Sequence, residues 1–423
     1  MKLTQFLENS YTAYHACDNV KEILLENGFS ELKENEVWNI SEGGKYFAVR
    51  DGSSVIAFTM GKNFGFNIVA SHSDSPCFKV KFGSDLKSDN YKKFNVERYG
   101  GGLFYTWFDR PLKLAGRIIV KDGNTLKNVL FTSSKTFVLP SLAIHFNRNA
   151  NDGFKLNAQT DMSPIESVIG SEDIRSEINA AACGKEVIDC DLFIVSAETP
   201  FSAGLQDELL CAPRIDNLTS ALSSVEAIIS ASPKAINVAY IADNEEVGSH
   251  TKQGAASKFL FDTLKRIALS LKKSEEEFSA ALANSFIISA DNAHAVHPNH
   301  PELSDPVQRV KMGEGIVIKH HANQNYTTDA FSSAVIKTVF KDAGVKYQDF
   351  YMRSDLPCGG TLGAISSAQV SIRSADIGLA QLAMHSAVET VFAADYDEMR
   401  KGLTAFYSLS FNSDGYDTLT IDK

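Results

Sequence analysis

Short apolar segments alternate with longer helix-like segments along the second half of this chain. Ala235–Ala242 and Phe286–Ala290 are mostly apolar runs of strand length. Helices are expected over residues 217–230, 258–282 (one or two helices), 327–343 and 379–394. Strands that alternate with helices form mostly parallel sheets that helices cover on both faces. The sequence therefore predicts an α/β domain.

The segment between residues 90 and 208 has a different, β-rich character. Residues 117–121 and 129–132 flank Asp122-Gly123-Asn124, which is typical of a hairpin turn. Upstream, residues 3–27 carry apolar positions at helical spacing and end at Gly28, while 44–58 and 66–70 are expected to be strands. We therefore expect residues 1–89 and 209–423 to form one α/β domain together, interrupted by a β-rich domain at 90–208.

Composition excludes several classes of function. The chain of 423 residues carries 41 Lys and Arg against 52 Asp and Glu, a net charge of −11. This acidity argues against nucleic acid and against an anionic membrane surface as partners. No apolar run approaches the roughly 18 residues that span a bilayer. The six cysteines include no C-x-x-C pair, so we expect reduced thiols and a cytoplasmic protein.

Three predicted strands end in residues that can bind metal ions. These residues are His72 and Asp74 after the run at 66–70, Glu245 and Glu246 after Ala235–Ala242, and Asp291 after Phe286–Ala290. Ligands of open α/β sheets bind at the carboxyl ends of strands, so the three endings together favour one shared site. Each ending alone is also compatible with the start of an ordinary loop.

The pairs at two of these endings suggest a division of roles. His72 and Asp74 share one face of an extended segment, so the acid can support the histidine as a ligand; a histidine in a solvated loop is the alternative. Adjacent carboxylates such as Glu245 and Glu246 repel each other and resist burial unless a cation is near. One of them can bind a metal while the other acts as general base. The alternative is a helix N-terminus, where acids are favoured.

Asp216 and His385 complete a possible metal site, although neither is specific alone. Asp216 precedes a predicted helix and is equally compatible with an N-cap. His385 lies among small and apolar residues, where a core histidine is the ordinary interpretation. Together with His72, Glu246 and Asp291 they form a set whose three carboxylates, with a shared hydroxide, would balance the charge of two divalent ions. A neutral cluster of this kind can be buried. Mixed imidazole and carboxylate ligands fit zinc, cobalt or manganese.

Other histidines are weaker candidates. His294, His297 and His300 are evenly spaced, but Pro298 and Pro301 break any helix that would align them. We interpret them as a polar loop beside the main site, with a second metal site as the alternative.

Taken together and in order, these motifs resemble the M18 metallopeptidases, the aspartyl aminopeptidase family. The matching segments are ASHSDSPCFK from Ala70, YGGG from Tyr99, LPSLAIH from Leu139, PRIDN from Pro213, DNEEVGS from Asp243, SADNAHAVHPN from Ser289, SDLPCG from Ser354 and QLAMHS from Gln381. The resemblance covers nearly the whole chain. It implies a zinc-peptidase-type mixed sheet covered by helices, with the 90–208 insert serving as a β-rich dimerisation domain.

The resemblance also implies roles for individual residues. Two divalent ions, zinc first with cobalt or manganese possible, would be held by His72 and Glu246 on one side and Asp291 and His385 on the other, or a close permutation, with Asp216 bridging. Glu245 would be the general base, and Asp74 would orient and polarise His72. Lys319 and Tyr326 match residues near the substrate side chain, and His145 matches a histidine that reaches an active site, that of a partner subunit. Dimers would assemble into a tetrahedral dodecamer.

The implied activity is removal of an N-terminal residue, preferably Asp or Glu, from peptides with a free N-terminus. Two departures from the family pattern bear on that preference: Gly360 and Leu362 stand where a hydroxyl residue and Ile are expected, and His320-His321 follows Lys319. The alternatives are a peptidase of the same core that prefers neutral residues, an amidohydrolase on that core, and a shell-forming scaffold without turnover.

Overall fold

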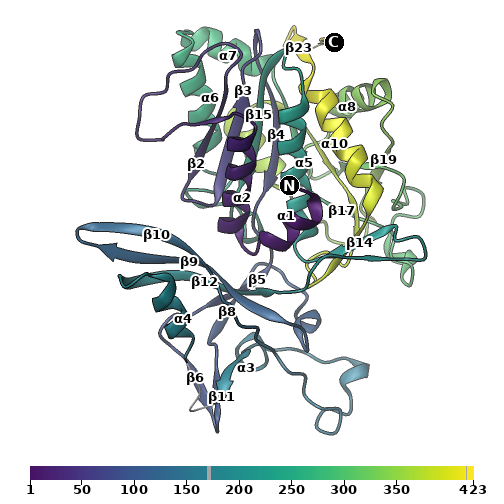
Figure 1. Ribbon diagram of the computed structural model, residues 1–423. Coiled ribbons are helices and arrows are strands. Elements are labelled where there is room, and N and C mark those ends of the chain that lie inside the picture. Colours follow the sequence, from purple (N-terminus) through teal and green to yellow (C-terminus); the bar gives the residue numbers. More distant parts are fainter. Residues whose placement is uncertain (169–172, 416) are drawn as a thin grey trace.

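A nine-stranded mixed sheet is the centre of the larger of two regions in the computed structural model, which describes residues 1–168, 173–415 and 417–423 (Figure 1). Its order is β1 (Ser30–Glu31), β2 (Lys45–Arg50), β3 (Ser54–Thr59), β15 (Ala235–Ala242), β4 (Asn63–His72), β16 (Phe286–Ala290), β20 (Arg373–Gly378), β18 (Ile316–His320) and β19 (Tyr347–Tyr351). The four central strands, β15, β4, β16 and β20, run parallel to one another.

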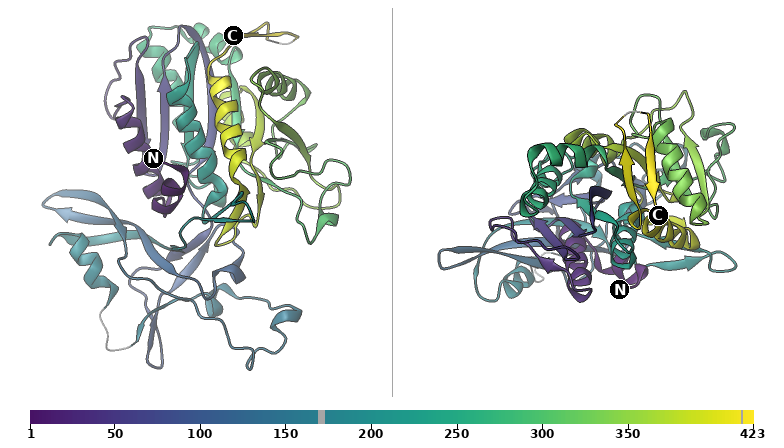
Figure 2. Two further views of the ribbon diagram at one scale, coloured as in Figure 1. Left: turned by 45° about the vertical axis from the view of Figure 1, so that its right-hand side comes forward. Right: turned by 90° about the horizontal axis from the view of Figure 1, so that it is seen from above.

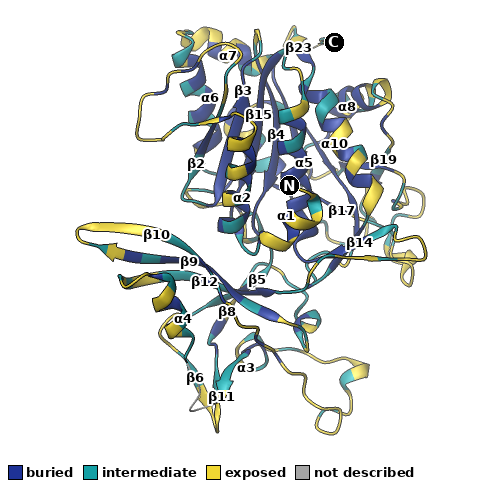
Figure 3. Cartoon of the chain, in the orientation of Figure 1, coloured by how far each residue is buried: buried dark blue, intermediate teal, exposed yellow. Residues whose placement is uncertain are grey.

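Helices cover both faces of this sheet, as Figures 1 and 2 show. One apolar core lies under α1 (Leu3–Asn9), α2 (Ala13–Glu26), α5 (Ile215–Ser230), α8 (Ala330–Asp342) and α10 (Ala393–Tyr407). The other lies under α6 (Phe259–Ser270), α7 (Glu275–Ala283) and α9 (Leu362–Val370). Helices on both faces explain why every residue of β15 and β16 is buried and why most of these residues are apolar, and Figure 3 shows these central strands in the buried colour. The predicted mixed α/β sheet covered by helices is confirmed.

The smaller region is built on a second sheet, in the order β10 (Thr125–Thr132), β9 (Leu112–Asp122), β12 (Glu186–Ser196), β5 (Cys77–Val80) and β8 (Val96–Tyr99). It also contains β6 (Leu86–Ser88), β7 (Tyr91–Lys93), β11 (Ile165–Val168), α3 (Ala158–Asp161) and α4 (Ile174–Ala181). Strands β9 and β10 form the predicted hairpin, in which Gly123 takes a positive φ of 62°. Because β5 belongs to this sheet, the chain leaves the large sheet before residue 90. The division of the chain at residues 90 and 208 stays a prediction.

A third, five-stranded sheet lies at the junction of the two regions, and a hairpin closes the chain. The sheet has the order β13 (Phe201–Ala203), β14 (Leu209–Ala212), β22 (Glu389–Phe392), β21 (Ala380–Leu382) and β17 (Ala293–His294). The hairpin pairs β23 (Ser410–Ser413) with β24 (Leu419–Asp422).

Most predicted elements of the α/β domain are present, with one clear exception. The predicted strands Ala235–Ala242 and Phe286–Ala290 are confirmed, and Gly28 follows α2 in a left-handed conformation with φ 79°. The helix predicted over 379–394 is wrong: this segment forms β21, a loop and β22, and α10 begins at Ala393. Its small apolar residues suit a helix, but strand pairing and the left-handed conformation at His385, φ 67°, override that preference.

A glycine at the end of β20 allows β16 to approach closely. A Cβ at Gly378 would lie 1.9 Å from the main-chain oxygen of Asp291, so no larger residue fits without moving backbone. We expect Gly378→Ala to lower the free energy of unfolding by about 1–3 kcal/mol, the usual cost of overpacking. Thermal or urea unfolding measures this loss.

Gly359→Ala is the matched control, because a Cβ there meets nothing within 4 Å. Equal stability of the Gly378→Ala and Gly359→Ala proteins would contradict the close approach of β16 and β20.

Candidate metal centre and active site

The three predicted strand endings meet at one edge of the large sheet. Strands β15, β4 and β16 are neighbours and parallel, so their carboxyl ends lie side by side. His72 is the last residue of β4, Asp291 directly follows β16, and Glu245 opens a 3₁₀ turn, Glu245–Val247, just after β15. The sheet itself therefore brings together residues that are far apart in sequence.

Asp216 is shared by two groups of ligand-type side chains. Its Oδ1 lies 3.5 Å from His72 Nε2, which is also 3.8 Å from Asp291 Oδ1. Its Oδ2 lies 3.5 Å from His385 Nε2, which is also 3.3 Å from Glu246 Oε1. Within each group the ligand atoms all lie within 4.8 Å of one another, a spacing that one metal ion could bridge.

This grouping is the permuted form of the pairing that the resemblance implies. His72 lies with Asp291, because β4 and β16 are adjacent strands. Glu246 lies with His385 in the other group. Asp216 has non-helical torsions, φ −79° and ψ 108°, at the start of α5, and its side chain faces the two histidines. The simple N-cap interpretation of Asp216 is therefore wrong.

Each histidine of the cluster uses its other ring nitrogen to contact a main-chain carbonyl. His72 Nδ1 lies 3.0 Å from the oxygen of Asp74, and His385 Nδ1 lies 3.0 Å from the oxygen of Gly101. A carbonyl only accepts, so each Nδ1 carries a proton and donates it, and each Nε2 is the ring atom that faces the carboxylates. This tautomer and orientation are the ones that metal-binding histidines use.

The carboxylate of Asp74 mainly holds the turn that carries Glu245 and Glu246. Its Oδ1 accepts the N–H of Glu245 and its Oδ2 accepts the N–H of Glu246, both at 3.1 Å. Its Oδ1 is 3.4 Å from His72 Nδ1, farther than the main-chain oxygen of the same residue. Asp74 thus contacts the histidine chiefly through its main chain.

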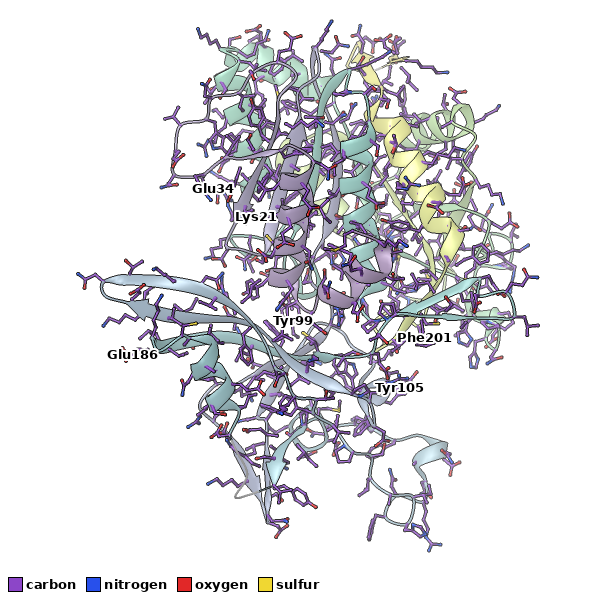
Figure 4. The ribbon with its side chains drawn as sticks, viewed as in Figure 1. Lys21, Glu34, Tyr99, Tyr105, Glu186 and Phe201 are labelled. Carbon is purple, nitrogen blue, oxygen red and sulfur yellow. The ribbon has the colours of Figure 1, made fainter. Side chains whose placement is uncertain are left out.

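Sequence reasoning missed two contributions from the smaller region. Tyr99, at the end of β8, donates its hydroxyl to Asp74 Oδ2 at 2.7 Å, and Gly101 supplies the carbonyl that holds His385. Figure 4 shows Tyr99 at the junction of the two regions. The segment reads as a plain turn, and Gly100 does have a positive φ of 74°. The signal in the sequence was the run of three glycines, whose missing side chains permit a close approach: a Cβ on Gly100 would lie 3.2 Å from Glu246 Cβ.

The cluster is buried and strongly perturbed electrostatically. Burial, with Asp291, Glu246 and Asp74 nearby, raises the pKa of Glu245 to about 8, and burial likewise raises the pKa of Glu246 to about 6. Burial alone would lower the pKa of His385, but contacts with Asp216 and Glu246 raise it to about 12. The pKa of His72 is raised in the same way, by Asp216 and Asp291. The cluster is therefore an acidic site that attracts positive charge.

The chemistry of these residues fits divalent metal ions. Asp216 Oδ1 and Glu246 Oε1 are buried, yet within the described residues neither accepts a hydrogen bond. Unsatisfied buried oxygens are costly. Two imidazole nitrogens and three carboxylates are a ligand set typical of zinc and similar ions.

A family comparison agrees with this geometry. Residues 6–407 match the family model described as aminopeptidase I zinc metalloprotease (M18). The chain belongs to the M18 aminopeptidase family. It is therefore a metalloaminopeptidase of the mixed α/β fold that the sequence predicted.

Individual relatives of this M18 aminopeptidase extend the likeness over nearly the full length. A probable M18 family aminopeptidase 2 from Clostridium acetobutylicum is 42% identical over 96% of this chain and 98% of its own. A probable aspartyl aminopeptidase from Ricinus communis is 33% identical over 96% and 94%. The solved structure of the S. cerevisiae mApe1 dodecamer is 26% identical over 96% and 95%, with a TM-score of 0.83. No helix in the described ranges is long and apolar enough to cross a bilayer.

The other predicted site residues fall into two groups. Lys319 is 1% exposed, donates from Nζ to the main-chain oxygen of Asn292 at 3.2 Å, and lies 4.8 Å from the centre of the Tyr326 ring. Lys319 and Tyr326 therefore lie beside Asp291. His145, by contrast, is exposed on the segment between β10 and α3 and belongs to neither group of ligand side chains.

The remaining histidines do not form a second centre. Among the described residues, the groups of ligand-type side chains include neither His294, His297 nor His300. His294 ends strand β17, and His297 and His300 lie in the loop that follows it.

The raised pKa values predict how the metal-free M18 aminopeptidase responds to pH. The pKa of Glu245 is raised from 4.5 to about 8 and that of His385 from 6.5 to about 12, so the folded state binds protons that the unfolded chain releases. Stability from such groups is present below the unfolded pKa and is lost as pH rises through the folded one. We expect the melting temperature of the chelator-treated protein to fall between about pH 6 and about pH 8.5.

In Glu245→Gln the melting temperature should decrease less over this pH range, because the change removes one of the titrating groups. Added zinc should raise the melting temperature more at the higher pH, where fewer protons compete for the ligands. A melting temperature of the metal-free protein that rises over this range would contradict the assignment.

Proposed function

We propose that the protein is a dinuclear zinc aminopeptidase that removes N-terminal Asp or Glu from peptides. The observation that carries this proposal is the position of Asp216 between His72 and His385, with a carboxylate on either side. A single ion would not need a shared ligand between two groups. Metal ions bound there would supply Lewis-acid activation of the scissile carbonyl and of a water molecule.

Glu245 is the general base in this proposal. Its carboxylate lies within 4.8 Å of ligand atoms of His72 and Glu246 but is not part of the two groups that share Asp216. It would take the proton of the attacking water and pass it to the leaving amine. Asp74 supports this role, because it accepts the N–H of Glu245 and so fixes the start of the turn.

Lys319 is the group that would recognise an acidic substrate side chain. Burying a substrate carboxylate in an acidic protein requires a local cation. The Lys319 ammonium is already desolvated beside Tyr326, and within the described residues it forms no ion pair. Its contact residue Asn292 directly follows Asp291, so Lys319 lies next to the candidate metal centre. The likeness to a probable aspartyl aminopeptidase supports the same preference.

Assembly into dimers and then a dodecamer is part of the proposal. The mApe1 relative has been solved as a dodecamer. In this chain, Leu142, Ile144 and Phe146 expose 50% or more of their surface on the segment that carries His145. Such apolar exposure is typical of an interface. We propose that residues 90–208 form the dimer contact and that His145 reaches the centre of a partner subunit.

The Glu245→Gln variant tests the chemistry. It keeps the size of the side chain but removes the base, so we expect kcat to fall by about 10²–10⁴-fold while zinc content stays near normal. Single-turnover kinetics and metal analysis measure both quantities. Glu246→Gln is the control that should lose zinc. Loss of zinc from Glu245→Gln would make Glu245 a ligand and would refute its role as base.

The Lys319→Leu variant tests the specificity. Removing one partner of a buried charge pair should lower kcat/KM for an Asp-anilide by a factor that corresponds to about 2–4 kcal/mol of lost transition-state stabilisation. A Leu-anilide should be cleaved at least as well as by the wild-type protein. The deciding quantity is the Asp/Leu ratio of kcat/KM, measured for Lys319→Leu, for His145→Ala and for the double variant. An unchanged ratio in all three would mean that acidic selectivity arises elsewhere or is absent.

A further inference from the structure

A buried carboxylate outside both ligand groups connects the segments that carry two of the candidate ligands. Glu389, the first residue of β22, is 1% exposed. Its Oε2 accepts the main-chain N–H of Asp216 at 2.9 Å, and its Oε1 accepts the main-chain N–H of His385 at 2.7 Å. Glu389 therefore joins the segment of Asp216, from which it is 173 residues away in the sequence, to the segment of His385.

Neither of these two segments is held by regular secondary structure at the ligand itself. Asp216 precedes the regular part of α5 with non-helical torsions, and its N–H is among the first amides of a helix, which have no partner within the helix. His385 has a positive φ of 67° in the loop between β21 and β22. The pairing of Ala212 in β14 with Glu389 in β22 brings the two segments together.

We propose that Glu389 is a positioning residue for the metal centre: it fixes the main chain of Asp216 and His385 so that both side chains reach the ion bound with Glu246. This inference rests on the proposed dinuclear site. Within the described residues, no Lys, Arg or His lies in ion-pair contact with Glu389. A buried carboxylate without such a partner is a poor source of stability. Its two short contacts with the segments of candidate ligands supply a reason for its presence.

The geometry requires two acceptors. A carboxyl group presents an oxygen at both of its ends, and here each oxygen accepts a main-chain N–H, whereas an amide of the same shape presents an NH₂ group at one of its two ends. In Glu389→Gln one main-chain N–H would therefore face a donor, and either Asp216 or His385 would have to shift. Changes in residues that orient metal ligands typically weaken metal binding by about 10–100-fold.

The experiment measures zinc binding by purified full-length Glu389→Gln in competition with a chromophoric chelator. We expect the zinc ion held with Glu246 to bind about 10–100-fold more weakly, because Asp216 and His385 both belong to its group, while the ion with His72 and Asp291, whose group contains only Asp216 of the two, changes less. Total zinc at limiting chelator should fall from two per chain toward one.

Asp395→Asn is the matched control. Asp395 is also a buried acid, 2% exposed, that accepts two main-chain amides, those of Gly313 at 2.8 Å and Gly315 at 3.0 Å. The same acid-to-amide change there reports the general cost of losing such a contact. We expect Asp395→Asn to lower the melting temperature of the chelator-treated protein without changing either zinc affinity.

The outcomes separate the inference from the proposed function. Wild-type zinc affinities in Glu389→Gln, or equal weakening in Asp395→Asn, would overturn the inference and leave the proposed function intact. A wild-type protein that binds no zinc would overturn the proposed function and the inference with it. Should Glu389→Gln fail to fold, Glu389→Asp keeps both acceptors on a shorter side chain, and the same selective loss of one zinc ion is expected from it.

Discussion

The acidic residues at the strand ends must be buried together, and this constraint governs the structure around them. Asp74, Asp216 and Asp291 are each less than 10% exposed, and Glu245 and Glu246 lie beside them. Charges in a low-dielectric setting are tolerated only when cations or hydrogen-bond donors face them. Here main-chain amides face Asp74, and the two histidines face Asp216. The oxygens that remain without donors point to the place that positive ions would take.

Strand-end residues could be predicted from the sequence because the fold places them by a general rule. A continuous apolar run marks a strand buried on both faces, and neighbouring parallel strands present their carboxyl ends at one edge. His72, Glu245 and Asp291 follow from this rule, and the runs at Ala235–Ala242 and Phe286–Ala290 are the strands themselves. The grouping of the candidate ligands could not be predicted by this rule, because it depends on which strands are adjacent, and no local sequence pattern indicates the order of the strands in the sheet.

Residues placed by tertiary contacts could not be found in this way. His385 lies in a segment of Leu, Ala and Gln that suits a helix, yet strand pairing and a left-handed torsion decide its conformation. Tyr99 and Gly101 come from a glycine-rich turn whose only local signal is the absence of side chains. What they contribute, a hydroxyl donor and a carbonyl acceptor, is available from many residues, so residue type alone carries no information about the role.

The candidate metal centre consequently depends on both regions of the molecule. The large sheet, the start of α5 and the loop between β21 and β22 supply the candidate ligands, whereas the turn after β8 supplies contacts that orient His385 and Asp74. The two regions are tied together away from this site as well: Arg117 of β9 donates to the main-chain oxygen of Asp51 at 2.9 Å, and His15 of α2 contacts Thr132 of β10 at 2.9 Å. A shift of the β-rich sheet would therefore move Tyr99 and Gly101 relative to Asp74 and His385, the residues that they contact. Because these contacts are short and directional, small displacements between the regions would move the candidate metal ligands, so the interface between the regions helps to hold the candidate site in place.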